Sequence, residues 1–381
     1  MKILPLTLYV HLPWCVRKCP YCDFNSHALD GAVPEQDYLP ALLADLDLEA
    51  ARAAGRPVHA IFFGGGTPSL FSAAAIGSIL DRAAERLALT DDCEVTLEAN
   101  PGASEQERFA GYRAAGVNRI SIGVQSFDDA MLRALGRIHD GADAARAIDA
   151  AARAGFNRIN LDLMHVLPGQ DVAGALTDIE RALSYDTGHL SYYQLTIEPN
   201  TAFHNAPPQL PDDDAAATIQ DAAYARLAAV GYRQYEVSAW ARPGDECRHN
   251  LNYWRFGDYL GVGAGAHGKL SDDSGRIVRT WKLRHPRAWA DPSADKVDGT
   301  QELAPPDARF EFMLNALRLR DGFTEKDFYE RTDRPFSEID RPIASAVDRG
   351  LLERSSTGWQ ATERGWRFLN DLQALFLPPG P

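Results

Sequence analysis

The sequence predicts an α/β protein, namely a partial (β/α)6 barrel followed by a mainly helical, winged-helix-like C-terminal domain. Short apolar, β-branched runs recur through residues 1–206, and each is followed by turn residues and an alanine-rich segment with helical spacing. Strands that alternate with helices in this way are joined as parallel neighbours by right-handed crossovers. From about residue 304 this alternation gives way to helices and one short strand.

The chain of 381 residues, 45% of them hydrophobic, is long enough for a large domain and a smaller one. Its net charge of -14 argues against a nucleic-acid partner, because such proteins normally carry a basic patch. The N-terminal segment has the features of neither a signal peptide nor a membrane span. Five cysteines, three of them clustered, do not form an even disulfide framework, so we expect a cytoplasmic protein with reduced thiols.

The expected elements follow from this pattern. We expect strands at residues 6–12, 59–63, 94–98, 119–123, 158–164 and 189–195, with helices at 37–54, 73–88 and 141–154 among the connections. Residues 207–303 form a barrel extension that we expect to close the mouth, with a strand at 236–240 and a strand and glycine-rich loop at 259–268. Residues 304–381 contain three expected helices, a strand at 358–362 and one terminal amphipathic helix.

Polar and glycine residues follow each of the six expected strands. The segments are 15–22, 64–68, 98–102, 123–127, 162–170 and 196–201. Because ligands bind at the carboxyl ends of parallel strands, all six segments point to one site.

The strongest chemical signal is the run HLPWCVRKCPYC, which holds Cys15, Cys19 and Cys22. A cubane iron–sulfur cluster has four irons, so three thiolates leave one coordination position open for a reactive ligand. The alternative is a zinc site completed by His11 or His27, although the paired spacing typical of zinc sites is missing. In GGGTP, Gly64–Gly66 have no side chains and would let a ligand approach the backbone closely.

CxxxCxxC after the first strand together with GGGTP after the second resembles the radical S-adenosylmethionine (SAM) enzymes. That resemblance implies a 4Fe-4S cluster on the three cysteines, with SAM on the open iron as the source of a 5′-deoxyadenosyl radical. The motifs EANP, SIGVQSF, LGRIH and NLDLMHVLPGQ and the C-terminal module extend the resemblance, over nearly the whole chain, to the oxygen-independent coproporphyrinogen III oxidase branch. It implies that these residues surround SAM: Tyr9, Tyr21, Gly65, Gly66, Thr67, Glu98, Gln125, Arg137 and Asp162. Taken singly, Glu98 and Asp162 could instead cap helices, and Arg137 could be a surface residue.

Two features depart from the decarboxylating oxidase. That enzyme has a further cysteine after the cluster motif, where this chain has Asp23 and Phe24, and a long segment before the motif, where this chain has fourteen residues before Cys15. The oxidase's substrate and second-cofactor apparatus is therefore in doubt.

The hexapeptide HNLNYW is similar to the haem-binding motif of the HemW family, the heme chaperones of this superfamily. The resemblance implies His249 as a haem ligand, with Asn250, Tyr253 and Trp254 shaping the site and Cys247 as a weaker candidate. Taken alone, such a hexapeptide is more often a buried Tyr-Trp pair beside a hydrogen-bonded histidine.

We therefore expect a heme chaperone that carries haem to apo-hemoproteins, including membrane-associated recipients, and that forms a homodimer. The alternative is an oxygen-independent coproporphyrinogen III oxidase, which would be an enzyme in the full sense. A third possibility, a cluster-bearing regulator that binds DNA through the C-terminal module, fits the negative net charge of the chain least well.

Overall fold

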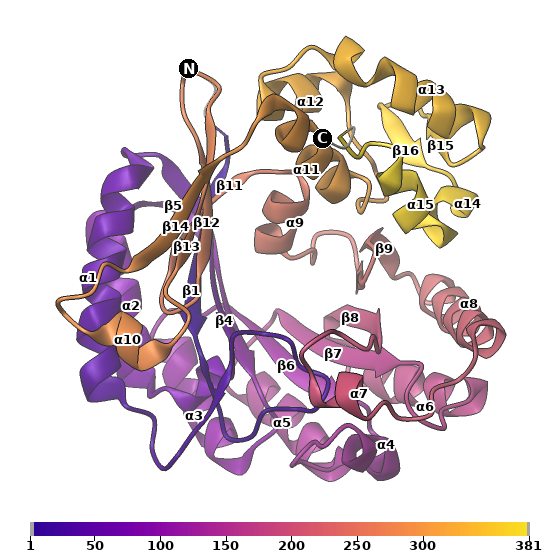
Figure 1. Cartoon of the computed structure of the whole chain (residues 1–381). Helices are drawn as coiled ribbons and strands as arrows, with labels where there is room; N and C mark the ends of the chain where they lie inside the picture. Colours follow the sequence, from indigo (N-terminus) through magenta and orange to yellow (C-terminus); the bar gives the residue numbers. More distant parts are fainter. Residues whose placement is uncertain (1–3, 379–381) are drawn as a thin grey trace.

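Six parallel strands form the centre of the fold and are paired in the order in which they occur along the chain (Figure 1). The structure, a computed structural model, describes residues 4–378, with the side chains of residues 103–106 left aside. The prediction of six parallel strands is confirmed. They are β1 (Leu6–Leu12), β4 (Pro57–Gly65), β5 (Ala88–Ala99), β6 (Arg119–Gln125), β7 (Ile159–His165) and β8 (Gly188–Gln194).

Strand β5 is longer than the sequence predicts. It begins at Ala88 rather than at residue 94, and its first five residues are partly or fully exposed. An apolar run marks only the buried part of a strand, so this polar extension gave no signal.

The crossover helices pack on the outer face of the sheet. They are α1 (Glu35–Ala53), α2 (Ala73–Arg86), α3 (Ala103–Ala114), α5 (Gly141–Arg153) and α6 (Val172–Leu183), with the shorter α4 (Asp129–Ala134). The starts of α2, α4, α5 and α6 are set by polar caps. For example, the Ser72 hydroxyl accepts from the Ala75 amide, and Asp140 forms a capping box with Asp143.

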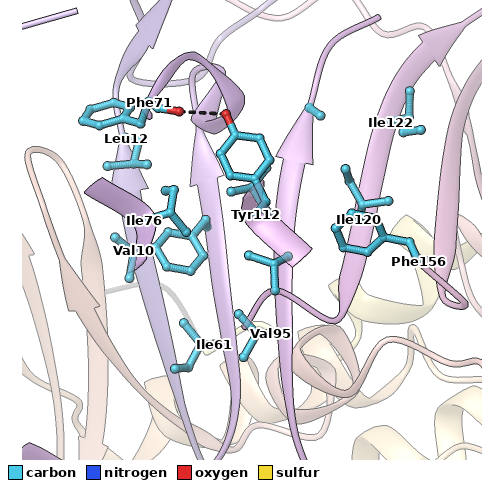
Figure 2. Close-up of a cluster of buried hydrophobic side chains, with 14 of the residues drawn as sticks. Val10, Leu12, Ile61, Phe71, Ile76, Val95, Tyr112, Ile120, Ile122 and Phe156 are labelled. Carbon is cyan, nitrogen blue, oxygen red and sulfur yellow. Dashed lines mark hydrogen bonds between the residues drawn. The ribbon is translucent and has the colours of Figure 1, made fainter. Parts of the chain in front are cut away.

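Figure 2 shows the hydrophobic core between the sheet and these helices. Val10, Ile61 and Ile120, from three strands, are fully buried there, and Ile76 of α2 packs in the same cluster. Burying one such side chain contributes roughly 1.5–3 kcal/mol. The hydroxyl of Tyr112 donates to the Phe71 carbonyl at 2.7 Å, which satisfies a polar group inside this apolar layer.

The extension lengthens the sheet at both edges, which the sequence did not predict. On the β8 side lie β10 (Ala239–Ala241) and β9 (Arg233–Glu236), both antiparallel to their neighbours. On the β1 side, β11 (Asp258–Val262) pairs in parallel, and β12 (His267–Ser271), β13 (Ile277–Lys282) and β14 (Val297–Glu302) follow as antiparallel strands. The sheet therefore has twelve strands and is open, with β14 and β9 at its edges.

The prediction of one strand at residues 236–240 is wrong, because the chain turns between β9 and β10. The amide of Val237 at this turn donates to the carbonyl of Arg318, at 3.1 Å, so its pairing partner comes from the C-terminal domain. The remaining helices of the extension are α7 (Ala202–Asn205), α8 (Asp213–Ala229), α9 (Arg248–Trp254) and α10 (Pro286–Ala290). Helix α8 packs on α6 in the outer layer, whereas α9 contacts β1 and β4 from the inner face.

The C-terminal part is helical with one small hairpin, and it has its own core. It contains α11 (Pro305–Ala316), α12 (Glu325–Thr332), α13 (Asp340–Asp348), β15 (Leu352–Arg354), β16 (Trp359–Ala361), α14 (Glu363–Arg367) and α15 (Leu369–Ala374). The expected single terminal helix is divided at Phe368, whose backbone is not helical. Phe312, Phe328 and Leu372 are buried in this core, and Phe256 of the extension joins them.

Candidate functional site

Alternating side chains on the central strands separate an apolar outer face from a polar inner face. On β5, for example, Val95 and Leu97 enter the hydrophobic core, whereas Glu98 lines the cavity inside the sheet. The same alternation on β6 and β7 turns Gln125 and Asp162 toward that cavity. The inner face is therefore a collection of hydrogen-bonding groups from separate strands.

One cavity of about 730 Å³ gathers most of the residues that the sequence singled out. Its lining includes Cys15, Cys19, Tyr21, Cys22, Gly65, Gly66, Thr67, Glu98, Gln125, Arg137, Asp162, Asn250 and Trp254. Tyr9, His249, Tyr253 and the weaker candidate Cys247 are not part of this lining.

Each of the three thiols of the cysteine loop has one hydrogen-bonding side chain beside it. The Thr67 hydroxyl donates to Cys15 Sγ at 3.5 Å, and Arg137 Nη1 donates to Cys19 Sγ at 3.4 Å. Cys22 Sγ lies 3.8 Å from the Ser26 hydroxyl. Hydrogen bonds to sulfur are one of the means by which proteins tune iron–sulfur clusters.

The donor set, three thiols facing one cavity, fits an iron–sulfur cluster. All three cysteines are free thiols that face one cavity, yet within residues 4–378 no three Cys, His, Asp or Glu side chains converge closely enough to hold one ion. Burial raises the pKa of Cys15 and Cys22, so the uncoordinated thiols are protonated, and binding a cluster would release these protons.

The histidines considered for a zinc site point elsewhere. His11 uses both ring nitrogens, with Nδ1 3.0 Å from the Tyr9 hydroxyl and Nε2 2.9 Å from the Asn25 carbonyl oxygen. His27 lines a different cavity, together with His285. Neither histidine lines the cavity of the three thiols.

The glycines of GGGTP allow close packing within the protein, and Gly65 and Gly66 also line the cavity. A Cβ on Gly66 would lie 2.5 Å from the Trp14 carbonyl oxygen, and a Cβ on Gly65 would lie 2.6 Å from the His11 ring. The Thr67 amide donates to the same Trp14 carbonyl at 2.7 Å. The glycines thus let this loop press directly against the cysteine loop.

Asn100 is a site residue that the sequence reasoning missed, although it stands in the EANP motif. Its Nδ2 donates to the Thr67 hydroxyl at 2.8 Å, and its Oδ1 accepts from Arg137 Nη2 at 2.6 Å. Arg137 also donates to the Gly123 carbonyl at 2.9 Å. Because Thr67 and Arg137 contact Cys15 and Cys19, Asn100 couples two of the three thiols through one hydrogen-bonded chain.

Glu98 and Asp162 are two buried carboxyl groups on the inner face of the sheet that would repel each other if both were ionised. Burial, and then the nearby Asp162, raises the pKa of Glu98 to about 8, while the Gly65 amide opposes this shift. Burial also raises the pKa of Asp162, although Asp162 accepts from Ser121 at 3.1 Å and Asn160 at 2.7 Å. Two buried acids that resist ionisation favour a ligand that donates hydrogen bonds or carries positive charge.

Gln125 sits at the end of β6 with a φ of 68°, in the left-handed region that non-glycine residues rarely adopt. Its Oε1 accepts from the Tyr193 hydroxyl at 2.6 Å. Tyr193 also lines the cavity and is a second residue that the sequence reasoning missed. The strained backbone turns the amide of Gln125 along the cavity wall.

Helix α9 carries HNLNYW and divides the motif between two environments. Asn250 and Trp254 line the cavity, one turn apart on the same helical face. His249 is buried, with its ring centroid 4.9 Å from that of Phe62 and 6.1 Å from that of Tyr9. Burial lowers the pKa of His249 to about 4, and its Nδ1 has no hydrogen-bond partner within the described part of the chain.

Cys247 belongs to a polar cluster beneath the cavity and does not line it. Its Sγ donates to Glu94 Oε1 at 3.5 Å, and Arg158 forms an ion pair with Glu94 at 2.7 Å. Burial raises the pKa of Cys247 to about 12, so the thiol is neutral. Glu94 also accepts from the Arg248 amide at 3.0 Å and so fixes the start of α9.

Comparison with known proteins agrees with this arrangement. Residues 9–181 match the model of the radical SAM superfamily, and residues 303–368 match that of the HemN C-terminal domain. The chain is 50% identical over 377 residues to the heme chaperone HemW of Escherichia coli, covering 99% of each chain. It is 33% identical over 378 residues to the heme chaperone HemW of Bacillus subtilis, covering 97% of this chain and 98% of the other.

A solved structure shows the fold. Coproporphyrinogen III oxidase (HemN) from Escherichia coli, described as a radical SAM enzyme, matches with a TM-score of 0.83 at 23% identity, covering 99% of this chain and 91% of the other. Within the described residues, no helix is long and apolar enough to cross a membrane. On its full-length identity to these relatives, the chain belongs to the HemW family of heme chaperones.

Proposed function

We propose that this protein binds a 4Fe-4S cluster, SAM and haem, and delivers the haem to apo-hemoproteins. The observation that carries the proposal is that a single cavity holds three free thiols as well as Asn250 and Trp254 of the HNLNYW helix. A cofactor on the thiols and a planar ligand against α9 would therefore share one cavity.

Cys15, Cys19 and Cys22 would hold the cluster, which supplies one-electron chemistry when bound. Thr67, Arg137 and Ser26 already stand beside the three sulfurs. Through its two amide atoms, Asn100 keeps Thr67 and Arg137 at these positions.

The residues proposed for SAM line the same cavity, apart from Tyr9. Glu98 and Asp162 offer acceptors to ribose hydroxyls or to an ammonium group, and Arg137 offers donors to a carboxylate. Tyr21 provides an aromatic wall, and Gln125 is fixed by Tyr193. Tyr9 would support the site indirectly, since it lies outside the cavity lining and its hydroxyl contacts His11 Nδ1 at 3.0 Å.

For haem, Trp254 and Asn250 are the residues of the motif that face the cavity directly. His249, proposed as an axial ligand, is kept neutral by burial, as iron ligation requires. Because its ring packs against Phe62 outside the cavity lining, ligation by His249 requires a movement of α9. Tyr253 packs against Tyr259 at 5.3 Å and would support the helix from its other side.

The test is a haem titration followed by absorption spectroscopy on anaerobically reconstituted protein. His249→Ala should weaken haem binding and shift the haem spectrum, with iron and sulfide content unchanged. An unchanged spectrum would remove His249 from the site. Transfer is then measured by mixing haem-loaded protein with an apo-hemoprotein and following the recipient's spectrum.

The rival activity is tested with the same preparation. Incubation with coproporphyrinogen III, SAM and a reductant should give no protoporphyrinogen, and robust formation of that product would overturn the chaperone proposal. We further propose a cytoplasmic homodimer with membrane-associated hemoproteins among its recipients. Light scattering and pull-down with candidate apo-proteins test these points.

A further inference from the structure

One wall of the cavity is assembled from three distant parts of the chain. Trp254 ends α9, Glu236 ends β9, and Arg318 follows α11 in the C-terminal part. All three residues line the cavity that also contains the cysteine thiols. In Figure 1, α9 lies between the central sheet and the C-terminal part. Arg318 of that part lines the cavity together with Trp254 of α9.

The backbone around Arg318 is held in place by pairing with the end of β9. The Arg318 carbonyl accepts from the Val237 amide at 3.1 Å, and the Arg320 amide donates to the Tyr235 carbonyl at 3.0 Å. Leu319 forms an antiparallel bridge with Glu236. Arg318 is therefore positioned before any ligand arrives, which lowers the entropic cost of using it in binding.

The side chain of Arg318 is stacked but incompletely paired. Its guanidinium carbon lies 4.2 Å from the centre of the Trp254 ring. Among the described residues it forms one ion pair, with Glu236, in which Nη2 lies 3.5 Å from Oε2, a long contact for a charged pair. Burial also raises the pKa of Glu236, so this carboxyl ionises less readily and competes less strongly with a ligand carboxylate for Arg318.

Two buried donors on this wall have no acceptor. Arg318 Nε and Trp254 Nε1 are both buried without a hydrogen-bond partner within residues 4–378. Leaving a buried donor unpaired costs on the order of 1–3 kcal/mol, so such groups usually meet a ligand or water. An arginine on an aromatic face is well suited to a flat ligand that carries a carboxylate.

We infer that Arg318, stacked on Trp254, binds a carboxylate of the planar ligand in this cavity, which for haem is a propionate. The inference rests on the proposed function and adds to it a residue from the C-terminal part. It gives that part a direct role in recognising the cargo. SAM also carries a carboxylate, so the experiment must separate the two sources.

The experiment compares two ligands and three proteins. Haemin and haemin dimethyl ester, whose propionates are esterified, are titrated into the reconstituted parent, Arg318→Gln and Arg320→Gln. Arg320 is a matched control: its guanidinium lies 4.4 Å from the Trp366 ring and pairs with Glu363 at 2.8 Å, but it does not line the cavity. SAM affinity is measured on the same samples.

The parent should prefer haemin over the ester by roughly tenfold or more, the usual scale for a charge-assisted hydrogen bond. Arg318→Gln should lose this preference, binding haemin about as weakly as the parent binds the ester, whereas Arg320→Gln should keep it. SAM affinity should be the same in all three proteins. A preference that survives in Arg318→Gln, or an equal loss for both ligands, would overturn the inference.

The remaining outcomes are also decisive. If Arg318→Gln lowers SAM affinity and leaves the haemin preference intact, the carboxylate is that of SAM and the inference is wrong. If the parent binds haemin and ester equally, the propionate site is refuted while haem binding stands. If the parent binds neither ligand, the proposed function itself fails, and the inference fails with it.

Discussion

The raised pKa of Glu98 predicts that SAM binding depends on pH. The pKa of this buried carboxyl lies near 8, so at neutral pH it is largely protonated before SAM binds. An ammonium or a ribose hydroxyl of SAM stabilises the ionised form, and binding should therefore release a proton. Affinity should rise as the pH increases toward 8 and then level off.

The size of the effect follows from linkage between protonation and binding. If bound SAM keeps Glu98 ionised, affinity should increase on the order of 20-fold between pH 6.5 and 8.5, and about 0.9 protons should be released per SAM at pH 7. The change expected to remove this dependence is Glu98→Gln, which keeps the size of the side chain but cannot ionise.

The assay is isothermal titration calorimetry of SAM into reconstituted protein, in two buffers of different ionisation enthalpy at each pH. The ammonium of SAM titrates in a similar range, but it does so equally with both proteins and cancels in their ratio. Parallel curves for parent and Glu98→Gln, or no proton release by the parent at pH 7, would refute the assignment of the titrating group to Glu98.

Three further predictions concern the cluster, the loops and stability. Cys19→Ala should abolish the visible absorption and iron content of the reconstituted cluster, and full iron retention would contradict the ligand assignment. Asn100→Ala removes one charge-assisted and one neutral hydrogen bond and should lower the free energy of unfolding, measured by urea titration, by about 1–3 kcal/mol. It should also shift the absorption spectrum of the reconstituted cluster. An unchanged spectrum would show that Asn100 does not position the thiols. Burial raises the pKa of Asp178 to about 6, above its unfolded value, so this group's stabilising contribution is greatest at acid pH and falls as pH rises toward neutrality. Relative to the parent, Asp178→Asn should gain about 2 kcal/mol of stability between pH 4 and pH 7, and a constant difference would exclude this titration.

Local patterns predicted the central fold well. The apolar run of β1 gave its bounds to the residue, and the six strands are parallel neighbours in chain order. Patterns failed where pairing is not local. The turn between β9 and β10 depends on a hydrogen bond from Val237 to the Arg318 carbonyl, some eighty residues away, and no window of sequence contains both partners.

The candidate site was predicted in part, for a similar reason. Motifs at strand ends identified Glu98 and Asp162, because parallel strands bring their carboxyl ends together whatever the details of packing. Asn100 was missed since its importance lies in two partners from other loops. The packing role of Gly66 was not predicted, because only the folded chain shows that the Trp14 carbonyl lies where its side chain would be.

By itself, the sequence determined the strand order, the cysteine loop and the inward-facing polar residues, because strand periodicity and motif spacing are local properties of the chain. Only the tertiary structure decided that HNLNYW is divided, with Trp254 facing the cavity and His249 packed behind it against Phe62. It also decided that Arg318 of the C-terminal part reaches the same cavity. The physical reason is that helix rotation and domain docking are fixed by contacts among distant segments.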